Sequence, residues 1–272
     1  MQIIRSNDNA IVKRIVKLNS KKKCRQQFNE FVVEGSKLVA EAIRAGIKTK
    51  HCFTSEAFVG RHPKLIEQLK SCGSSVSLVA ENLVKRLSTT QTPQEIYCIC
   101  ELPSAALPTH EAAPGKYLAL IQLQNPDNLG AIIRTAAAFD LNGVYLSSDA
   151  VDIFSPKVLR ASMGACFWQK ITVISNLTLF LESCKNKSIS TYSAVLANDS
   201  IDSRTVNFGE DAIIFMGNEG NGLPADIICA TDHRIKISIA SPIDSLNVAV
   251  AAGIFAWQLQ KRNSCCKGCP DV

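Results

Sequence analysis

The stretch Ile237-Ser238-Ile239-Ala240-Ser241-Pro242-Ile243-Asp244-Ser245-Leu246-Asn247-Val248-Ala249-Val250-Ala251-Ala252 leads from the end of an apolar strand, through a small-residue turn, into an alanine-rich helix. Asp244 and Ser245 are good helix N-cap residues, so free backbone N–H groups are expected to face the turn. Ser245 and Asn247 would then stand where a ligand meets both side chain and backbone. A capping motif before a buried helix explains the same residues structurally, so this stretch alone leaves both interpretations open.

Strands and helices alternate through the region that ends in this stretch. Strands are predicted at residues 117–121, 144–146, 171–174, 190–195, 212–216 and 234–237, and a final helix from Ser245 to about Lys261. Apolar strands separated by helices predict an α/β domain with a mostly parallel sheet covered on both faces. Ligands of such sheets usually bind beyond the carboxyl ends of the strands, in the loops that open the helices.

One of these loops runs from Gln124 to Gly130 and precedes a helix over residues 131–139. Arg134 lies two turns into that helix, among apolar and small residues. Helix-opening N–H groups beside a fixed guanidinium suit a phosphate or a ribose-phosphate backbone. A surface arginine that extends to solvent is the alternative interpretation.

A second loop, Phe215 to Pro224, carries three glycines after a strand, in the pattern Gly217-x-x-Gly220-x-Gly222. Glycines in this position allow positive φ angles and a close approach of backbone to ligand. The spacing is neither the Rossmann dinucleotide fingerprint nor a P-loop. A glycine-rich turn whose Asn and Glu side chains bind local N–H groups would use the same residues.

Together the three loops resemble the three motifs of the SpoU family, the RNA ribose 2′-O-methyltransferases of the SPOUT superfamily. Asn128 to Thr135 is similar to the first motif, Gly217 to Gly222 to the second, and Ser245 to Val248 to the third. Phe31-Val32-Val33-Glu34-Gly35-x-Lys37 and Thr92-Pro93-Gln94 resemble the small substrate-binding domain that precedes the catalytic domain in many members. The resemblance covers nearly the whole chain apart from its tail.

The resemblance implies a C-terminal trefoil knot, S-adenosyl-L-methionine bound bent within the knot, and a homodimer. It implies a cofactor pocket lined by Gly217, Gly222, Ile237 and Leu246. It also implies a reacting centre that comprises Arg134, Asn128, Glu219, Ser245 and Asn247. No metal is expected in these loops.

The role of Arg134 has two interpretations. The resemblance assigns it the removal of the proton from the ribose hydroxyl. A guanidinium has a pKa above about 12 and is a poor base, so a clamp on the neighbouring phosphate is an equally good role.

The chain departs from the family pattern at a few positions. Ser238 and Ile239 stand where the last strand usually continues with proline and methionine, and Ser241 where the turn usually has glycine. These changes bear on the geometry of the cofactor loop and are expected to weaken cofactor binding. Glu95 stands where Thr-Pro-Gln is commonly followed by glycine. None of the departures removes a polar residue assigned to the chemistry, which predicts an active enzyme.

The N-terminal region predicts a separate small α/β domain over residues 1–102, joined by a linker over 103–115 to a catalytic domain over 116–262. Residues 1–30 contain eight lysine or arginine residues against two acidic ones, which accounts for the net charge of +6 of the whole chain. A concentrated basic segment on a neutral body indicates contact with a polyanion such as RNA, although a solvated helix face is equally compatible with it. The candidate RNA-binding residues are Lys21, Lys22, Lys23 and Arg25.

The eleven cysteines are scattered, which suits a reducing cytoplasm better than a disulfide framework. The N-terminus lacks the apolar core of a signal peptide, and no apolar run is long enough to span a membrane. Residues 263–272 form a Cys-rich tail that is predicted to be disordered. Its single Cys266-x-x-Cys269 pair is at best half of a zinc site.

These observations predict an S-adenosylmethionine-dependent enzyme that methylates a ribose 2′-hydroxyl in structured RNA, with ribosomal RNA favoured. Methylation of transfer RNA is one alternative. A non-catalytic RNA-binding protein that retains the fold is another. The complete set of five polar residues at the reacting centre favours the enzyme, because a binding protein has no chemical need for all five.

Overall fold

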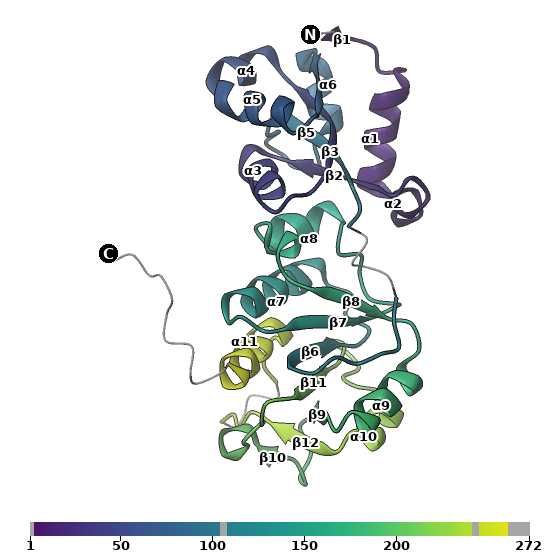
Figure 1. Ribbon diagram of the computed structural model, residues 1–272, viewed down its shortest axis with the longest axis vertical. Coiled ribbons are helices and arrows are strands. Elements are labelled where there is room, and N and C mark those ends of the chain that lie inside the picture. The colour runs from purple at the N-terminus through teal and green to yellow at the C-terminus, as the bar shows by residue number, and fades with distance from the viewer. Residues whose placement is uncertain (1–2, 104–107, 241–244, 261–272) are drawn as a thin grey trace, which may run out of the picture. The chain divides into compact units, whose positions relative to one another are not determined.

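The computed structural model describes residues 3–103, 108–240 and 245–260. The chain forms two compact units, each built around its own sheet (Figure 1). The first unit contains the residues up to 106 together with two later segments, 125–134 and 151–168. The second unit contains the remainder of the chain. The Cys-rich tail, Ser241 and Asp244 lie outside the described residues.

The first unit has a five-stranded mixed sheet in the order β1-β4-β3-β5-β2. The strands are β1 (Ile3–Ile4), β2 (Glu30–Glu34), β3 (Thr49–Thr54), β4 (Ser75–Val79) and β5 (Ile96–Glu101). Strands β1, β4 and β3 are parallel, whereas β5 runs antiparallel to both β3 and β2. The small α/β domain expected in the N-terminal region thus has a sheet of its own.

Helices of the first unit lie between its strands along the chain. They are α1 (Ala10–Ser20), α2 (Lys22–Phe28), α3 (Ser36–Arg44), α4 (Glu56–Arg61), α5 (Pro63–Ser71) and α6 (Glu81–Leu87). Asn9 caps α1 by accepting a hydrogen bond from Ile11 N, and the helix buries Val12, Ile15 and Leu18. These side chains pack in a core with residues of β2, β3, β5 and α6, which anchors the basic segment to the sheet.

Arg25 does not have the role predicted for it. Its side chain is buried in the first unit, where Nε lies 2.6 Å from Asp152 Oδ2 and Nη1 donates to the carbonyl of Leu18. A guanidinium engaged in this way is not available to an RNA phosphate, so Arg25 is a structural residue. Lys21, Lys22 and Lys23, by contrast, are exposed.

The carboxylate of Glu34 organises the polar loop after α6. Glu34 is buried at the end of β2, and its two oxygens accept hydrogen bonds from Ser88 Oγ at 2.5 Å, Thr89 N at 2.9 Å, Thr89 Oγ1 at 2.8 Å and Thr90 Oγ1 at 3.3 Å. Glu34 of the first motif is therefore hydrogen-bonded to residues 88–90, the polar segment directly before the second motif, Thr92-Pro93-Gln94.

Glu95 occupies a backbone conformation that favours glycine, with φ at +60°. Its side chain accepts a hydrogen bond from Ser55 Oγ at 3.0 Å and forms an ion pair with Arg61. The left-handed backbone explains why glycine is common after Thr-Pro-Gln, and the two side-chain contacts explain how glutamate is held there.

The second unit has a seven-stranded sheet in the order β10-β12-β9-β11-β6-β7-β8, and every pairing in it is parallel. Its strands are β6 (Lys116–Leu120), β7 (Gly143–Ser147), β8 (Ile171–Ile174), β9 (Ser190–Ala194), β10 (Ile201–Asp202), β11 (Ala212–Met216) and β12 (His233–Lys236). The six predicted strands are confirmed. The sequence analysis missed β10, which has only two residues.

Helices cover both faces of this sheet, as predicted. On one face, α9 (Leu177–Asn186) and α10 (Ala225–Ala230) pack against the side chains of Ile213 and Phe215. On the other lies α11 (Val248–Leu259), which packs along β11 and β6 (Figure 1). Residues before β6 also belong to this unit, because Thr109 N donates to Val173 O and Ala112 N to Ser183 Oγ. Thr109 and Ala112, which lie in the range expected for the linker, are thus bound to the second unit.

Two helices begin elsewhere than predicted. Helix α7 spans Pro126–Ala138 rather than starting at Ala131, because the side chain of Asn125 accepts a hydrogen bond from Asp127 N at 2.9 Å. Helix α11 begins at Val248 instead of Ser245. A short helix, α8 (Pro156–Ala161), lies in the segment 151–168. Among the described residues, no helix combines the length and apolarity needed to cross a membrane.

We predict that Glu34→Ala lowers the free energy of unfolding by about 2–4 kcal/mol, because hydrogen bonds to a charged acceptor are lost together. Glu34→Gln should cost less, since one oxygen still accepts. Denaturant unfolding of the full chain measures both. Glu67→Ala, an exposed glutamate on α5, is the control and should change stability by less than about 0.5 kcal/mol. Equal stability of Glu34→Ala and wild type would contradict the role assigned to the carboxylate.

Candidate functional site

Neighbouring parallel strands of the second unit end at a cavity of about 540 Å³. Its walls include the last residues of β9, β11 and β12 and those that follow them, because parallel strands present their carboxyl ends at one edge of a sheet. The loop 217–222 and residues 245–248 with the first turns of α11 complete the lining. The volume is that of a typical small-molecule site.

Seven of the nine residues predicted for the cofactor pocket and the reacting centre line this cavity. They are Gly217, Glu219, Gly222, Ile237, Ser245, Leu246 and Asn247. The sequence analysis missed the apolar lining residues, among them Leu196, Met216 and Phe255, and also Lys236. In the sequence, these residues are distinguished only by their positions at or after the ends of strands and within α11.

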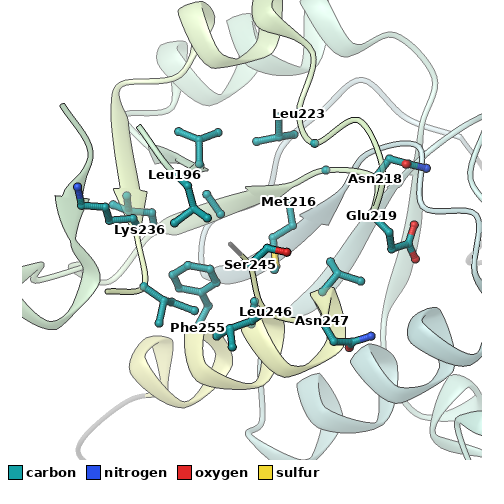
Figure 2. Close-up of a pocket in the computed structure, with 18 of the residues that line it drawn as sticks. Leu196, Met216, Asn218, Glu219, Leu223, Lys236, Ser245, Leu246, Asn247 and Phe255 are labelled. Carbon is teal, nitrogen blue, oxygen red and sulfur yellow. The ribbon is translucent and has the colours of Figure 1, made fainter. Parts of the chain in front are cut away.

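Polar and apolar side chains occupy different parts of the cavity. Figure 2 shows Asn218, Glu219 and Asn247 at one end, with Leu196 and Lys236 at the opposite end. Apolar side chains of Met216, Leu246 and Phe255 lie between these ends. A cavity of this kind can bury an apolar ring system and direct a few polar groups at a reacting atom.

The backbone of the loop after β11 closes on itself. Asn218 N donates to Gly222 O at 3.1 Å, and Gly222 N donates to Asn218 O at 2.9 Å. Gly222 has a φ of +67°. A Cβ added to Gly217 would clash with the backbone of Gly222 and with Leu223 N, so only glycine allows this closure.

The side chain of Asn218 connects this loop to its neighbours, a role that the sequence analysis did not assign. Its Oδ1 accepts from Gly220 N at 2.8 Å, while Nδ2 donates to Gln122 O at 2.9 Å. Gln122 N in turn donates to Ser147 Oγ at 2.8 Å. The loops after β11, β6 and β7 are therefore joined by a continuous chain of hydrogen bonds.

Asn247 caps the final helix, at a position two residues after Ser245. Its Oδ1 accepts from Ala249 N at 2.9 Å and from Val250 N at 3.3 Å. Ser245 is exposed at the cavity, and Leu246 is half-buried. Capping by Asn247 shows that the structural interpretation of this stretch holds, and the position of its residues on the cavity shows that a ligand can meet them as well.

Asn128 and Arg134 are not among the residues that line the cavity. Both lie on α7, and its residues up to Arg134 cluster with the first unit. Asn128 is buried in the first helical turn, whereas Arg134 is exposed and forms no ion pair with any residue that the structure describes. Gly130 lies between them, and a Cβ there would clash with Ala161 of α8.

Ser238, one of the departures noted in the sequence, is bound by a carboxylate. Its Oγ donates to Asp202 Oδ2 at 2.6 Å, so the segment between the lining residues Ile237 and Ile239 is joined to the end of β10. The Arg204 guanidinium, followed by the Ser238 hydroxyl, holds the pKa of the Asp202 carboxyl well below its usual range. Asp202 therefore accepts this hydrogen bond as a carboxylate.

No arrangement of three or more His, Cys, Asp or Glu side chains suited to a metal ion occurs in the part of the chain that the structure describes. The described cysteines of the first unit include Cys52, Cys98 and Cys100, all buried in the sheet. Burial raises the pKa of the Cys100 thiol far above its usual value. Thiols in this state are poor nucleophiles and poor metal ligands.

Comparison with known proteins gives matches over nearly the whole chain. Residues 115–257 match the SpoU rRNA Methylase family, and residues 9–98 match the MRM3-like substrate binding domain. The 23S rRNA (guanosine(2553)-2′-O)-methyltransferase RlmP of Bacillus subtilis is 32% identical, over 96% of this chain and 100% of the relative. An AdoMet-bound rRNA methyltransferase from Sinorhizobium meliloti has a similar structure, with a TM-score of 0.83, 30% identity, and coverage of 95% of this chain and 97% of that one.

We predict that Gly217→Ala destabilises the second unit by roughly 1–3 kcal/mol, because the new Cβ forces the backbone of Gly222 and Leu223 to move. Gly220→Ala is the matched control in the same loop. Its Cβ would meet only Asn218 Oδ1 at 3.5 Å, an ordinary contact. Thermal denaturation of both variants is the measurement, and equal melting temperatures would contradict the assigned closure.

Proposed function

Because the chain belongs to the SpoU rRNA Methylase family, we propose that methyl transfer takes place at the cavity bounded by β9, β11, β12 and α11. The chain is an S-adenosylmethionine-dependent RNA ribose 2′-O-methyltransferase. Its substrate is structured RNA, and the relatives favour ribosomal over transfer RNA. The observation that carries the assignment to this cavity is that seven of the nine residues expected at the cofactor and the reacting centre line it.

The residues of the cavity fit S-adenosylmethionine. Gly217, Gly222, Ile237 and Leu246 would hold it, because all four residues line the cavity. The apolar lining suits an adenine ring, and the polar end suits the charged part of the molecule. When bound, this cofactor supplies an electrophilic methyl group, so the protein must position the ribose hydroxyl and assist the loss of its proton.

The polar residues divide this work. Ser245 and Glu219 are exposed at the cavity, where they can meet a substrate nucleotide. Asn247 fixes the start of α11 and thereby orients Ser245 and Leu246. We propose that Arg134 clamps the phosphate beside the target ribose and that Asn128 stabilises the helix that carries it. An exposed guanidinium without an ion pair among the described residues is free to bind such a phosphate.

We also propose a homodimer and a cytoplasmic location for the protein. Helix α11 is apolar around its circumference, and it leaves Val250 54% and Trp257 65% exposed. An apolar helix face of this kind is suited to a homodimer interface. The eight described cysteines are all free, as is usual in the cytoplasm, where we propose that the protein acts. A trefoil knot in the C-terminal part of the catalytic domain belongs to the same proposal, as does RNA contact by Lys21, Lys22 and Lys23.

We predict that the protein binds S-adenosylmethionine in the presence of EDTA and that Ser238→Ala weakens binding about three- to tenfold. The reason is the loss of a hydrogen bond to a carboxylate that holds a lining segment in place. Asp202→Asn should have a similar effect, and the double variant should be no weaker than the stronger single variant, because both remove one interaction.

Isothermal titration calorimetry measures these affinities, and Ser71→Ala in the first unit is the control. Because the pKa of Asp202 is depressed, its contribution is present above the usual carboxyl range and is lost only in strong acid. The effect of Ser238→Ala should therefore be the same at pH 8 and pH 5. Additive losses in the double variant would show that Ser238 and Asp202 act separately.

The test of the proposed function is transfer of a labelled methyl group from S-adenosylmethionine to a 23S rRNA transcript, with the product mapped as a 2′-O-methyl nucleotide. Arg134→Ala should lower the rate by about 10²–10⁴ while cofactor affinity and melting temperature stay near wild type. Arg134→Lys should retain partial activity if the group is a phosphate clamp. Full activity of Arg134→Ala would leave Arg134 a surface residue without a role in the reaction, and failure of the variant to fold would make it a structural residue.

A further inference from the structure

A groove of about 550 Å³ lies on the first unit, between α3 and the junction of α4 with α5. It is lined by Ser36, Lys37, Ala40, Arg61, His62, Pro63, Lys64, Leu65 and Gln68. Most of these side chains are exposed, so the groove is open to a large ligand. Neither the catalytic cavity nor the exposed run Lys21–Lys23 contributes any of its residues.

The charges in the groove all have one sign. Lys37, Arg61 and Lys64 are cationic at neutral pH, and none of the lining residues is Asp or Glu. Within the described part of the chain, neither Lys37 nor Lys64 forms an ion pair. Arg61 is paired with Glu95, which Ser55 also binds, so the guanidinium is held at the groove while the two lysines remain uncompensated.

The two lysines project from helices that pack against the first unit. Helix α3 buries Val39 and Ala42 behind Lys37, and α5 buries Ile66 and Leu69 behind Lys64. Cations on packed helices keep a constant spacing, as a ligand with regularly placed anionic groups requires. The run Lys21–Lys23, in contrast, follows the end of α1 and opens a short helix.

We infer that this groove binds the phosphodiester backbone of the substrate RNA, an inference that rests on the proposed function. Lysine and arginine supply the charge for phosphates, and Ser36, His62 and Gln68 supply further polar groups of the kind that contact phosphate and sugar. The lining contains no aromatic ring apart from His62 and few large apolar side chains, as expected for a surface that reads shape and charge and not a protein partner.

The test compares two double variants that remove the same charge. Lys37→Ala/Lys64→Ala changes the groove, and Lys70→Ala/Lys85→Ala removes two exposed lysines of the first unit, one of them on α5, that do not line it. The probe is the 23S rRNA transcript of the methylation assay, titrated by fluorescence anisotropy between 50 and 200 mM salt. Melting temperature and S-adenosylmethionine affinity are measured for each variant to verify folding.

The groove variant should bind the transcript about 10–50-fold more weakly at 100 mM salt. Its slope of log affinity against log salt should be smaller by about 1.4–1.8, which corresponds to two lost phosphate contacts. The control variant should keep the wild-type slope to within about 0.3. Equal slopes for the two variants would overturn the assignment of the groove to RNA and would favour a protein partner instead. If both variants still methylate the transcript, the proposed function is unaffected by that result.

Discussion

Strand β11 hydrogen-bonds to β6 on one side and to β9 on the other, both in parallel register, and the site depends on this arrangement. Parallel pairing aligns the carboxyl ends of neighbouring strands at one edge of the sheet. The residues after β9, β11 and β12 thus meet at one cavity although they lie far apart in the sequence. The loop from Gly217 to Gly222 adds a second constraint, because its backbone closure leaves no room for a side chain at Gly217.

Hydrogen bonds then fix the loops relative to one another. The side chain of Asn218 donates to the backbone of Gln122, and Gln122 N donates to Ser147 Oγ, so hydrogen bonds connect the ends of three strands. Asn247 fixes the start of α11 in the same way. A methyltransferase of this kind relies on positioning, since misplacement of a reacting atom by about 1 Å can cost a hundredfold in rate. Hydrogen bonds between the loops serve that requirement.

Two positions at which the chain departs from the SpoU pattern have a common physical solution. Ser238 replaces a residue whose ring would restrict the backbone, and a hydrogen bond to Asp202 supplies the restraint instead. Glu95 replaces glycine in a left-handed conformation, and its contacts with Ser55 and Arg61 offset the backbone cost. In both places, a hydrogen bond or ion pair to a carboxylate holds a segment for which proline or glycine would otherwise set the backbone conformation. The second contact also holds Arg61 at the basic groove.

The sequence by itself determined the α/β class and the six main strands of the parallel sheet, because apolar periodicity is a local property of the chain. The seven cavity residues were expected only from the resemblance of three short motifs to the SpoU family. Only the tertiary structure decided the rest. The starts of α7 and α11 depend on which of several polar residues accepts a hydrogen bond from the first backbone N–H groups. In the folded protein these residues are Asn125 and Asn247. In the sequence, Arg25 cannot be distinguished from the exposed lysines beside it. In the folded protein it is buried and paired with Asp152, which lies 127 residues away. Contacts between residues so distant leave no periodic trace in the chain, and for the same reason the role of Asn218 and the convergence of Lys37 with Lys64 appear only in the folded protein.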